Sequence, residues 1–223
     1  MMASPDKAHY RDDRVTLYHG DYREVTDWLD ADLLVSDPPY GINWRRGVNH
    51  ARYSKAHAGI AGDGDTTARD TMLAMWGNRP AIVFASFYAP PPPNVVQVLV
   101  WHKPDDAGVV GSTTGYRRDA EPIYLTGQWP RRDVSASSVL RSCRASIKSV
   151  TVDTGHPHTK PLDLLHQLIL RAPGGMIADP FAGTGTTLRA AKDLGRPAIG
   201  VEIDLVYCQV AAGRLAQEVL DLV

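Results

Sequence analysis

The stretch from residue 176 to residue 204 constrains the fold of this 223-residue chain more than any other. It opens with a short apolar run at 176–178, which is typical of a buried strand, and continues into a turn that contains Gly183 and Gly185. A helical pattern follows, and then a second apolar run that ends in Glu202. Strands that alternate with helices in this way build parallel sheets, so the stretch predicts an α/β protein.

The glycine turn indicates which ligand such a sheet would bind. Gly183 and Gly185 leave room for backbone NH groups and the amino end of the next helix to face a ligand without a Cβ in the way. Glu202 is placed to accept hydrogen bonds from two ribose hydroxyls. Residue 188 is Leu, so the dinucleotide spacing Gly-x-Gly-x-x-Gly is not met, and the Gly-Lys-Ser/Thr ending of a triphosphate cradle is absent from the turn. A nucleoside without a phosphate remains as the predicted ligand.

A second candidate site follows another apolar run, at 31–36. Pro38 and Pro39 fix two consecutive φ angles and remove two backbone donors, so the carbonyls here stay free to accept hydrogen bonds. Asp37 adds an acceptor and Tyr40 adds a flat ring. Two acceptors beside a ring suit a planar group that carries an NH2, such as the exocyclic amine of a nucleobase turned out of a helix. The alternative is a strand followed by a plain proline turn, because Asp-Pro is a common turn opener.

The distribution of charge along the chain indicates where a nucleic acid could bind. The formal net charge is -1, so any polyanion must be met by a local basic patch. Segment 41–60 has four basic residues and no acidic one, and segment 127–152 has five basic residues against Asp133 alone. Both segments are candidates for phosphate contacts. The alternatives are a solvated surface loop for the first and a disordered polar loop for the second.

The remaining patterns predict one domain that spans residues 1–223. Pro161 can occupy the first turn of a helix whose apolar side chains recur at helical spacing, and Asp204 can cap a final helix. Strands at 95–101 and 121–125 have no obvious helix between them, which predicts an antiparallel pair at one edge of the sheet. The other predicted elements are strands at 14–20, 32–36, 81–87 and 198–201 and helical segments at 24–29, from Thr66 or Thr67 to 76, and over 188–194.

Other classes are disfavoured by composition. Cys143 and Cys208 are too few for a disulfide framework or a thiolate metal site, which suits a reducing cytoplasm. The chain shows no apolar leader and no run near the ~20 residues that span a bilayer, so we expect no membrane association. His156 and His158 lack a third and fourth ligand, so no metal site is predicted.

Two motifs carry a resemblance to a known family. Phe181-x-Gly183-x-Gly185 after Asp179-Pro180 resembles the S-adenosylmethionine motif of methyltransferases. Asp37-Pro38-Pro39-Tyr40 resembles the catalytic motif of DNA amino-methyltransferases, which methylate adenine N6 or cytosine N4. The catalytic motif comes first, and segment 155–165 resembles the family's His-Pro-Thr-x-Lys-Pro motif, which is the permuted, beta-class order. The resemblance implies a Rossmann-like methyltransferase fold, a mixed, mostly parallel sheet with helices on both faces.

The resemblance also implies residue roles and the cofactor S-adenosyl-L-methionine. Asp21 resembles the residue that meets the cofactor adenine, and Lys160 resembles part of the piece that closes over the methionine end. His158 departs from the family's Thr. The target base is assigned to Asp37, Pro38, Pro39 and Tyr40; the cofactor to Asp21, Lys160, Asp179, Phe181, Gly183, Thr184, Gly185, Thr186, Thr187 and Glu202; and DNA to Arg45, Arg46, Arg131, Arg132, Arg141, Arg144 and Lys148.

The implied function is methyl transfer to the N6 amine of adenine in double-stranded DNA. The Asp form of the catalytic motif resembles adenine enzymes, whereas cytosine enzymes more often have Ser there. N4-cytosine methylation and a non-catalytic regulator of the same fold are the alternatives, while protein-glutamine and RNA amine methyltransferases resemble the unpermuted order. We expect residues 127–152 to serve as a short target-recognition insert, which implies a short site, relaxed specificity, or a homodimer that grips the DNA.

Overall fold

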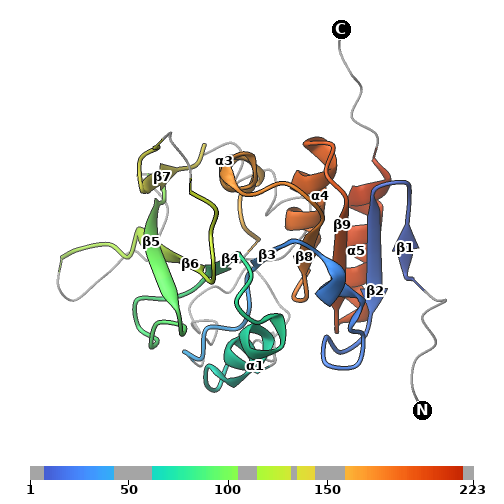
Figure 1. Ribbon diagram of the computed structural model, residues 1–223, viewed down its shortest axis with the longest axis horizontal. Helices are drawn as coiled ribbons and strands as arrows, with labels where there is room; N and C mark the ends of the chain where they lie inside the picture. Colours follow the sequence, from blue (N-terminus) through green and yellow to red (C-terminus); the bar gives the residue numbers. More distant parts are fainter. Residues whose placement is uncertain (1–7, 43–61, 105–114, 132–134, 144–158, 218–223) are drawn as a thin grey trace, which may run out of the picture.

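The computed structural model describes residues 8–42, 62–104, 115–131, 135–143 and 159–217 (Figure 1). Its strands form one nine-stranded sheet in the order β1-β2-β9-β8-β3-β4-β6-β5-β7. The strands are β1 Tyr10–Arg11, β2 Val15–His19, β3 Leu33–Ser36, β4 Ala81–Phe84, β5 Val95–His102, β6 Ala120–Thr126, β7 Val139–Arg141, β8 Ile177–Asp179 and β9 Ala198–Glu202. The helices are the 3-10 helix η1 Asp27–Asp30 and the α-helices α1 Thr67–Trp76, α3 Leu162–Arg171, α4 Thr186–Asp193 and α5 Leu205–Ala216.

The sheet is mixed and mostly parallel, as predicted. Strands β2, β9, β8, β3 and β4 are parallel neighbours, and the predicted antiparallel pairing of β5 with β6 is present. Because β6 runs antiparallel to both β4 and β5, strand β5 points the same way as β4 and β3. The carboxyl ends of β2, β9, β8, β3, β4, β5 and β7 therefore lie at one edge of the sheet, here called the carboxyl edge, where β6 begins.

Helices cover both faces of this sheet, which confirms the predicted arrangement (Figure 1). In β3 the side chains alternate: Leu33 and Val35 pack in one core cluster with α3, α4 and α5, while Leu34 packs in a second cluster with η1 and α1. All three side chains are fully buried. A strand buried on both faces reads as a continuous apolar run, which explains the pattern at 31–36.

Helix α3 follows its predicted spacing. Leu164, Leu165, Leu168 and Ile169 are buried in the first cluster, and Leu170 is exposed. Pro161 is the N-cap residue with φ -65°, which is compatible with the start of a helix. Among the described helices, none combines the length and apolar character needed to cross a membrane.

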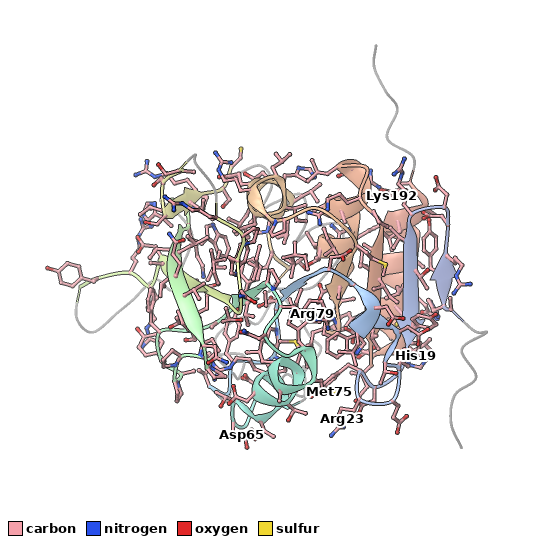
Figure 2. All side chains as sticks on the ribbon, in the orientation of Figure 1. His19, Arg23, Asp65, Met75, Arg79 and Lys192 are labelled. Atoms are coloured by element: carbon pink, nitrogen blue, oxygen red, sulfur yellow. The ribbon has the colours of Figure 1, made fainter. Side chains whose placement is uncertain are left out.

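The opposite face is held by aromatic packing. Trp28 of η1 stacks on Trp76 of α1 with ring centroids 6.0 Å apart. The Arg79 guanidinium lies 3.6 Å from the centre of the Trp76 ring and donates hydrogen bonds to the carbonyls of Leu29 and Ala31 (Figure 2). One cation thus ties the end of η1 to the end of α1.

Several local predictions differ from the structure. The helix at 24–29 is replaced by the 3-10 helix η1, and the strand at 81–87 ends at Phe84. Thr66 precedes α1 but its hydroxyl donates to Asp70 instead of accepting from the helix, while the Asp65 carboxylate accepts from the Thr67 backbone NH. Strands β1 and β7 were not predicted.

Candidate active site

The predicted catalytic motif leaves the carboxyl end of β3, a central strand between β8 and β4. The Tyr40 hydroxyl donates to Asp37 Oδ1 at 2.7 Å. The turn that follows is anchored by Asp63, which is 4 % exposed and accepts from the Gly41 backbone NH at 2.8 Å. Gly41 has φ +75° and passes so close to the backbone of Asp65 that a Cβ would stand 2.5 Å from it, so only glycine fits.

Lys160, assigned from the sequence to the cofactor, lies in contact with this motif. Its Nζ is 2.6 Å from Tyr40 Oη, 3.1 Å from Asp37 Oδ2 and 3.4 Å from Glu121 Oε2. Lys103 Nζ is 2.5 Å from the other Glu121 oxygen. Two carboxylates and two ammonium groups therefore alternate along the carboxyl edge, from Asp37 through Lys160 and Glu121 to Lys103.

This alternation fixes the charge states of the cluster. Burial lowers the pKa of Lys160, but the carboxylates of Asp37 and Glu121 outweigh it and leave that pKa raised. The pKa of Glu121 is lowered because Lys160 and Lys103 outweigh the effect of its burial. Burial, followed by the nearby Asp37 charge, holds the pKa of Tyr40 well above its usual range. Lys160 is a cation and Tyr40 a neutral hydroxyl at physiological pH.

The glycine turn leaves the carboxyl end of β8, beside the catalytic motif. Asp179 ends this strand and accepts from the Ser36 hydroxyl of β3 at 2.8 Å and from the Phe181 backbone NH at 3.2 Å. Glu202, at the end of β9, accepts from the backbone NH groups of Gly183 at 2.7 Å and Asp204 at 2.8 Å. The two sequence motifs, more than 140 residues apart, are thus joined through one hydrogen bond between neighbouring strands.

The two glycines of the turn have different roles. Both have positive φ, +52° at Gly183 and +79° at Gly185. A Cβ at Gly185 would stand 2.9 Å from the Cβ of Ala211 on α5, so this glycine allows the turn to pack on that helix. A Cβ at Gly183 would stand 4.0 Å from the Phe181 carbonyl oxygen, its nearest neighbour outside the adjoining residues. The backbone at Gly183 therefore offers open space beside the Glu202 carboxylate, the kind of face that a nucleoside ligand requires.

The three predicted threonines of the turn are buried and make internal contacts. Arg214 of α5 donates to the Thr184 carbonyl at 2.6 Å and to the Thr186 hydroxyl at 3.1 Å. The Thr187 hydroxyl bonds to Asp179, and Thr159 lies 3.3 Å from the Thr184 hydroxyl. These contacts shape the turn, and a direct role of the threonines toward a cofactor stays a prediction.

Asp21 lies at the same edge, two residues after the end of β2. Its carboxylate binds the Arg23 guanidinium, and this hydrogen bonding lowers the pKa of Asp21. The neighbouring Tyr22 ring is 4.8 Å from the ring of Phe181. The structure therefore gathers Asp21, Phe181 and Glu202 around the ends of three adjacent strands, although their contacts with a ligand stay predictions.

The predicted DNA-contacting residues are only partly described. Arg141 is exposed at the carboxyl end of β7, which pairs with β5 at His102. Arg131 is also exposed, but it follows β6, which ends at the opposite edge of the sheet. Arg45, Arg46, Arg132, Arg144, Lys148 and the histidines 156 and 158 lie outside the described residues.

Glu121 and Lys103 were missed by sequence reasoning. Glu121 is the second residue of β6 and pairs with Trp101 across the antiparallel ladder, which brings Lys103 next to it. The one local signal was an acidic residue at the start of an otherwise apolar strand. That signal identifies a charge near a strand end, but not the lysine 39 residues away that it contacts.

Comparison with known proteins relates part of the chain to a protein family. Residues 128–213 match a family model described as DNA methylase. The match covers this part of the chain and does not extend to the Asp37-Pro38-Pro39-Tyr40 motif. The resemblance to DNA methyltransferases is thereby confirmed, and the matched range includes the glycine turn and Glu202.

Two relatives extend this comparison. The chain is similar to Type II methyltransferase M.HinfI of Haemophilus influenzae, with 42% identity over 96 residues, 42% of this chain and 26% of that protein. It is also similar to Type II methyltransferase M2.DpnII of Streptococcus pneumoniae, with 45% identity over 65 residues, 28% of this chain and 24% of that protein. The matched stretches span about a quarter of the length of these curated relatives.

Solved structures share the fold. The M1.HpyAVI–SAM complex superimposes with a TM-score of 0.61 at 22% identity, over 90% of this chain and 100% of that one. The PvuII DNA methyltransferase (cytosine-N4-specific) superimposes with a TM-score of 0.65 at 15% identity, over 96% of this chain and 90% of that one. The Rossmann-like methyltransferase fold expected from the sequence is therefore confirmed.

Proposed function

We propose that the protein transfers a methyl group from S-adenosylmethionine to the exocyclic N6 amine of adenine in double-stranded DNA. The observation that carries the proposal is the hydrogen bond between Ser36 and Asp179, which joins the ends of β3 and β8. Through it, a nucleoside-binding turn and a carboxylate-aromatic pair come to the same edge of the sheet. A methyl donor in the first site and an amine in the second would be neighbours.

The residues present fit the cofactor. The open face at Gly183 lies beside the buried Glu202 carboxylate, which can bind ribose hydroxyls with its remaining lone pairs. Asp21 and Phe181 flank this position at the ends of β2 and β8. When bound, S-adenosylmethionine supplies an activated methyl group on a sulfonium whose leaving group is a neutral thioether.

The protein's own task is to orient the amine and stabilise the charge that develops on it. The lone pair of an exocyclic amine is delocalised into the base. Hydrogen bonds from its two NH groups to the Asp37 carboxylate and the Pro38 carbonyl would favour a pyramidal nitrogen with its lone pair directed at the methyl group. As the nitrogen becomes cationic, the negative charge of Asp37 attracts it more strongly, which lowers the barrier.

The proton lost from the amine requires a base. Within the cluster, Lys160 is already protonated and Tyr40 keeps its own proton, because the pKa of each is raised. The Asp37 carboxylate is the group of this cluster that can take a proton in contact with the amine. Asp37 therefore serves both as hydrogen-bond acceptor and as the first proton acceptor.

Replacement of this carboxylate tests the proposal. The change Asp37→Asn keeps the shape of the side chain but removes its charge and one acceptor, so we expect turnover to fall by at least roughly 100-fold. Affinity for S-adenosylmethionine should stay within about threefold, because Asp37 is not part of the glycine turn. Turnover is measured by digesting methylated duplex DNA to nucleosides and identifying them by mass spectrometry.

The same assay separates the alternatives. N6-methyladenine in the wild-type digest supports the proposal, and N4-methylcytosine keeps the mechanism but changes the base, because an acceptor pair can serve either amine. Cofactor binding without any methylated nucleoside contradicts methylation of duplex DNA and favours a regulator of the same fold.

A further inference from the structure

The Lys160 side chain contacts both Asp37 and Tyr40 of the catalytic motif. Its side chain is 10 % exposed and its three shortest polar contacts are to Tyr40 Oη, Asp37 Oδ2 and Glu121 Oε2, at 2.6, 3.1 and 3.4 Å. An ammonium group has three donors, and three acceptors surround this one. A lysine with its donors occupied in this way is poorly placed to leave and bind a cofactor carboxylate.

Three aromatic rings also lie near this cation. The Nζ atom lies 5.1 Å from the ring centre of Tyr40, 5.2 Å from that of Phe84 and 5.9 Å from that of Trp101. A cation removed from water in this way is stable only when it is paired. The Lys160 cation therefore depends on the carboxylates of Asp37 and Glu121 for charge compensation, and these carboxylates depend on Lys160.

The contacts form a closed triangle around the catalytic carboxylate. Tyr40 donates to Asp37 Oδ1 and accepts from Lys160, which also donates to Asp37 Oδ2. Each Asp37 oxygen thus has one fixed donor and keeps lone-pair capacity for a substrate NH. Loss of Lys160 would release both the carboxylate and the ring of Tyr40 to rotate.

Glu121 supports the lysine from the other side. It bridges Lys160 and Lys103, and it is held at the edge by the pairing of β5 with β6. The two carboxylates and two ammonium groups of the cluster cancel in charge. Among the described contacts, Glu121 reaches the Asp37 site through Lys160.

We propose that Lys160 is a positioning residue that fixes the Asp37 carboxylate and the Tyr40 ring for the target amine, with Glu121 as its support, and that it is not a ligand of the cofactor. This inference rests on the proposed methyl transfer. It replaces the cofactor role that the family resemblance implied for Lys160.

The test compares Lys160→Met, Lys160→Arg and Lys192→Met. Lys192 is the matched control, because its Nζ forms a 2.6 Å ion pair with Asp12 near β1 and β2, away from the carboxyl edge (Figure 2). We expect Lys160→Met to lower kcat by roughly 10- to 100-fold, the effect of a misplaced catalytic group, and Lys160→Arg to recover part of it. Lys192→Met should leave kcat unchanged.

Two binding measurements distinguish positioning from cofactor binding. Calorimetry gives the affinities for S-adenosylmethionine and for 5′-methylthioadenosine, which lacks the amino-acid carboxylate. We expect Lys160→Met to leave both affinities unchanged. A selective loss of S-adenosylmethionine affinity would make Lys160 a carboxylate ligand and overturn the inference.

Glu121→Gln tests the support of Lys160 by Glu121, and it replaces Lys160→Met as the test variant if Lys160→Met does not fold. It should lower kcat in the wild-type background but produce no further loss in the Lys160→Met background. A fully active Lys160→Met or Glu121→Gln protein overturns the inference alone. A wild-type protein that binds cofactor but methylates no DNA overturns the proposed function, and the inference with it.

Discussion

Asp179 is an acid whose environment contrasts with that of Asp37. It is 2 % exposed, and the donors that reach it are neutral: the Ser36 and Thr187 hydroxyls and the Phe181 backbone NH. Burial raises the pKa of Asp179 to about 7, and these hydrogen bonds offset only part of that effect. Asp37, by contrast, has Lys160 at 3.1 Å. The two acids therefore differ in burial, because the Asp37 side chain is 29 % exposed, and in the presence of a neighbouring cation.

The raised pKa of Asp179 predicts how stability depends on pH. An unfolded Asp has a pKa near 3.9, so between about pH 4 and pH 7 the folded protein holds a proton that the unfolded chain has lost. The contribution of this group to stability thus falls as pH rises through that window, by roughly 2 kcal/mol between pH 5 and pH 7. Above about pH 8 the carboxyl group is ionised in both the folded and the unfolded state, and the loss is complete.

Asp179→Asn should remove this dependence. The free energy of unfolding of the variant, measured by urea denaturation from pH 5 to pH 8, should fall less with rising pH than that of the wild-type protein. Asp13→Asn, at an exposed position, is the control and should keep the wild-type slope. An unchanged slope in Asp179→Asn would mean that Asp179 is ionised throughout this range.

At the scale of the element, α3 connects the core to the site. Pro161 caps it directly after Lys160, and its apolar side packs under the sheet. The position of the Lys160 ammonium therefore depends on how firmly this ten-residue helix is held.

Two leucines of α3 make a matched pair. Leu165 is 1 % exposed and Leu170 is 63 % exposed. Leu165→Ala should cost about 2 to 5 kcal/mol of unfolding free energy, because it removes packed atoms and leaves a cavity. Leu170→Ala should change it by less than about 0.5 kcal/mol. Urea denaturation measures both, and equal losses would contradict the packing of α3 described above.

Elements with a strong internal period were predictable from the sequence. Helix α3 has four buried side chains at helical spacing, and α5 begins where Asp204 accepts from the Val206 backbone NH. Strand β7 was not predictable, because its three residues lie in a polar stretch and pair only with the end of β5. Such a strand is specified by its neighbour and not by its own pattern.

The residues of the site also differ in how far the sequence predicts them. The motif residues Asp37 and Tyr40 could be found because proline, acid and ring are adjacent in the chain. The contact of Lys160 with Asp37 spans 123 positions and depends on the strand order, which no local pattern contains. Glu121 is brought to the site by the antiparallel pairing of β6 with β5, so its role could not be predicted before the fold was known.

At the scale of the whole molecule, the carboxyl edge gathers the ends of strands from both halves of the chain. The net charge of -1 gives no general attraction to DNA, so attraction must come from cations near this edge. Arg141 is exposed at the end of β7 on that edge, and its backbone carbonyl accepts a hydrogen bond from Gln167 of α3. Arg131 follows a strand that ends at the other edge.

This geometry predicts unequal effects for two arginines that the sequence alone assigned to the same role. If DNA lies across the carboxyl edge, Arg141→Ala should weaken binding and reduce the slope of log K against log salt by about one, the value for one lost phosphate contact. Arg131→Ala should leave the slope closer to that of the wild-type protein. Fluorescence anisotropy with a labelled duplex between about 50 and 200 mM salt, the range over which such contacts weaken markedly, measures both slopes. Equal losses would mean that the DNA also reaches the far end of β6, and that segment 127–152 contacts it along its whole length. A loss confined to Arg141 would instead restrict the contact to the edge where Asp37, Lys160 and the glycine turn meet.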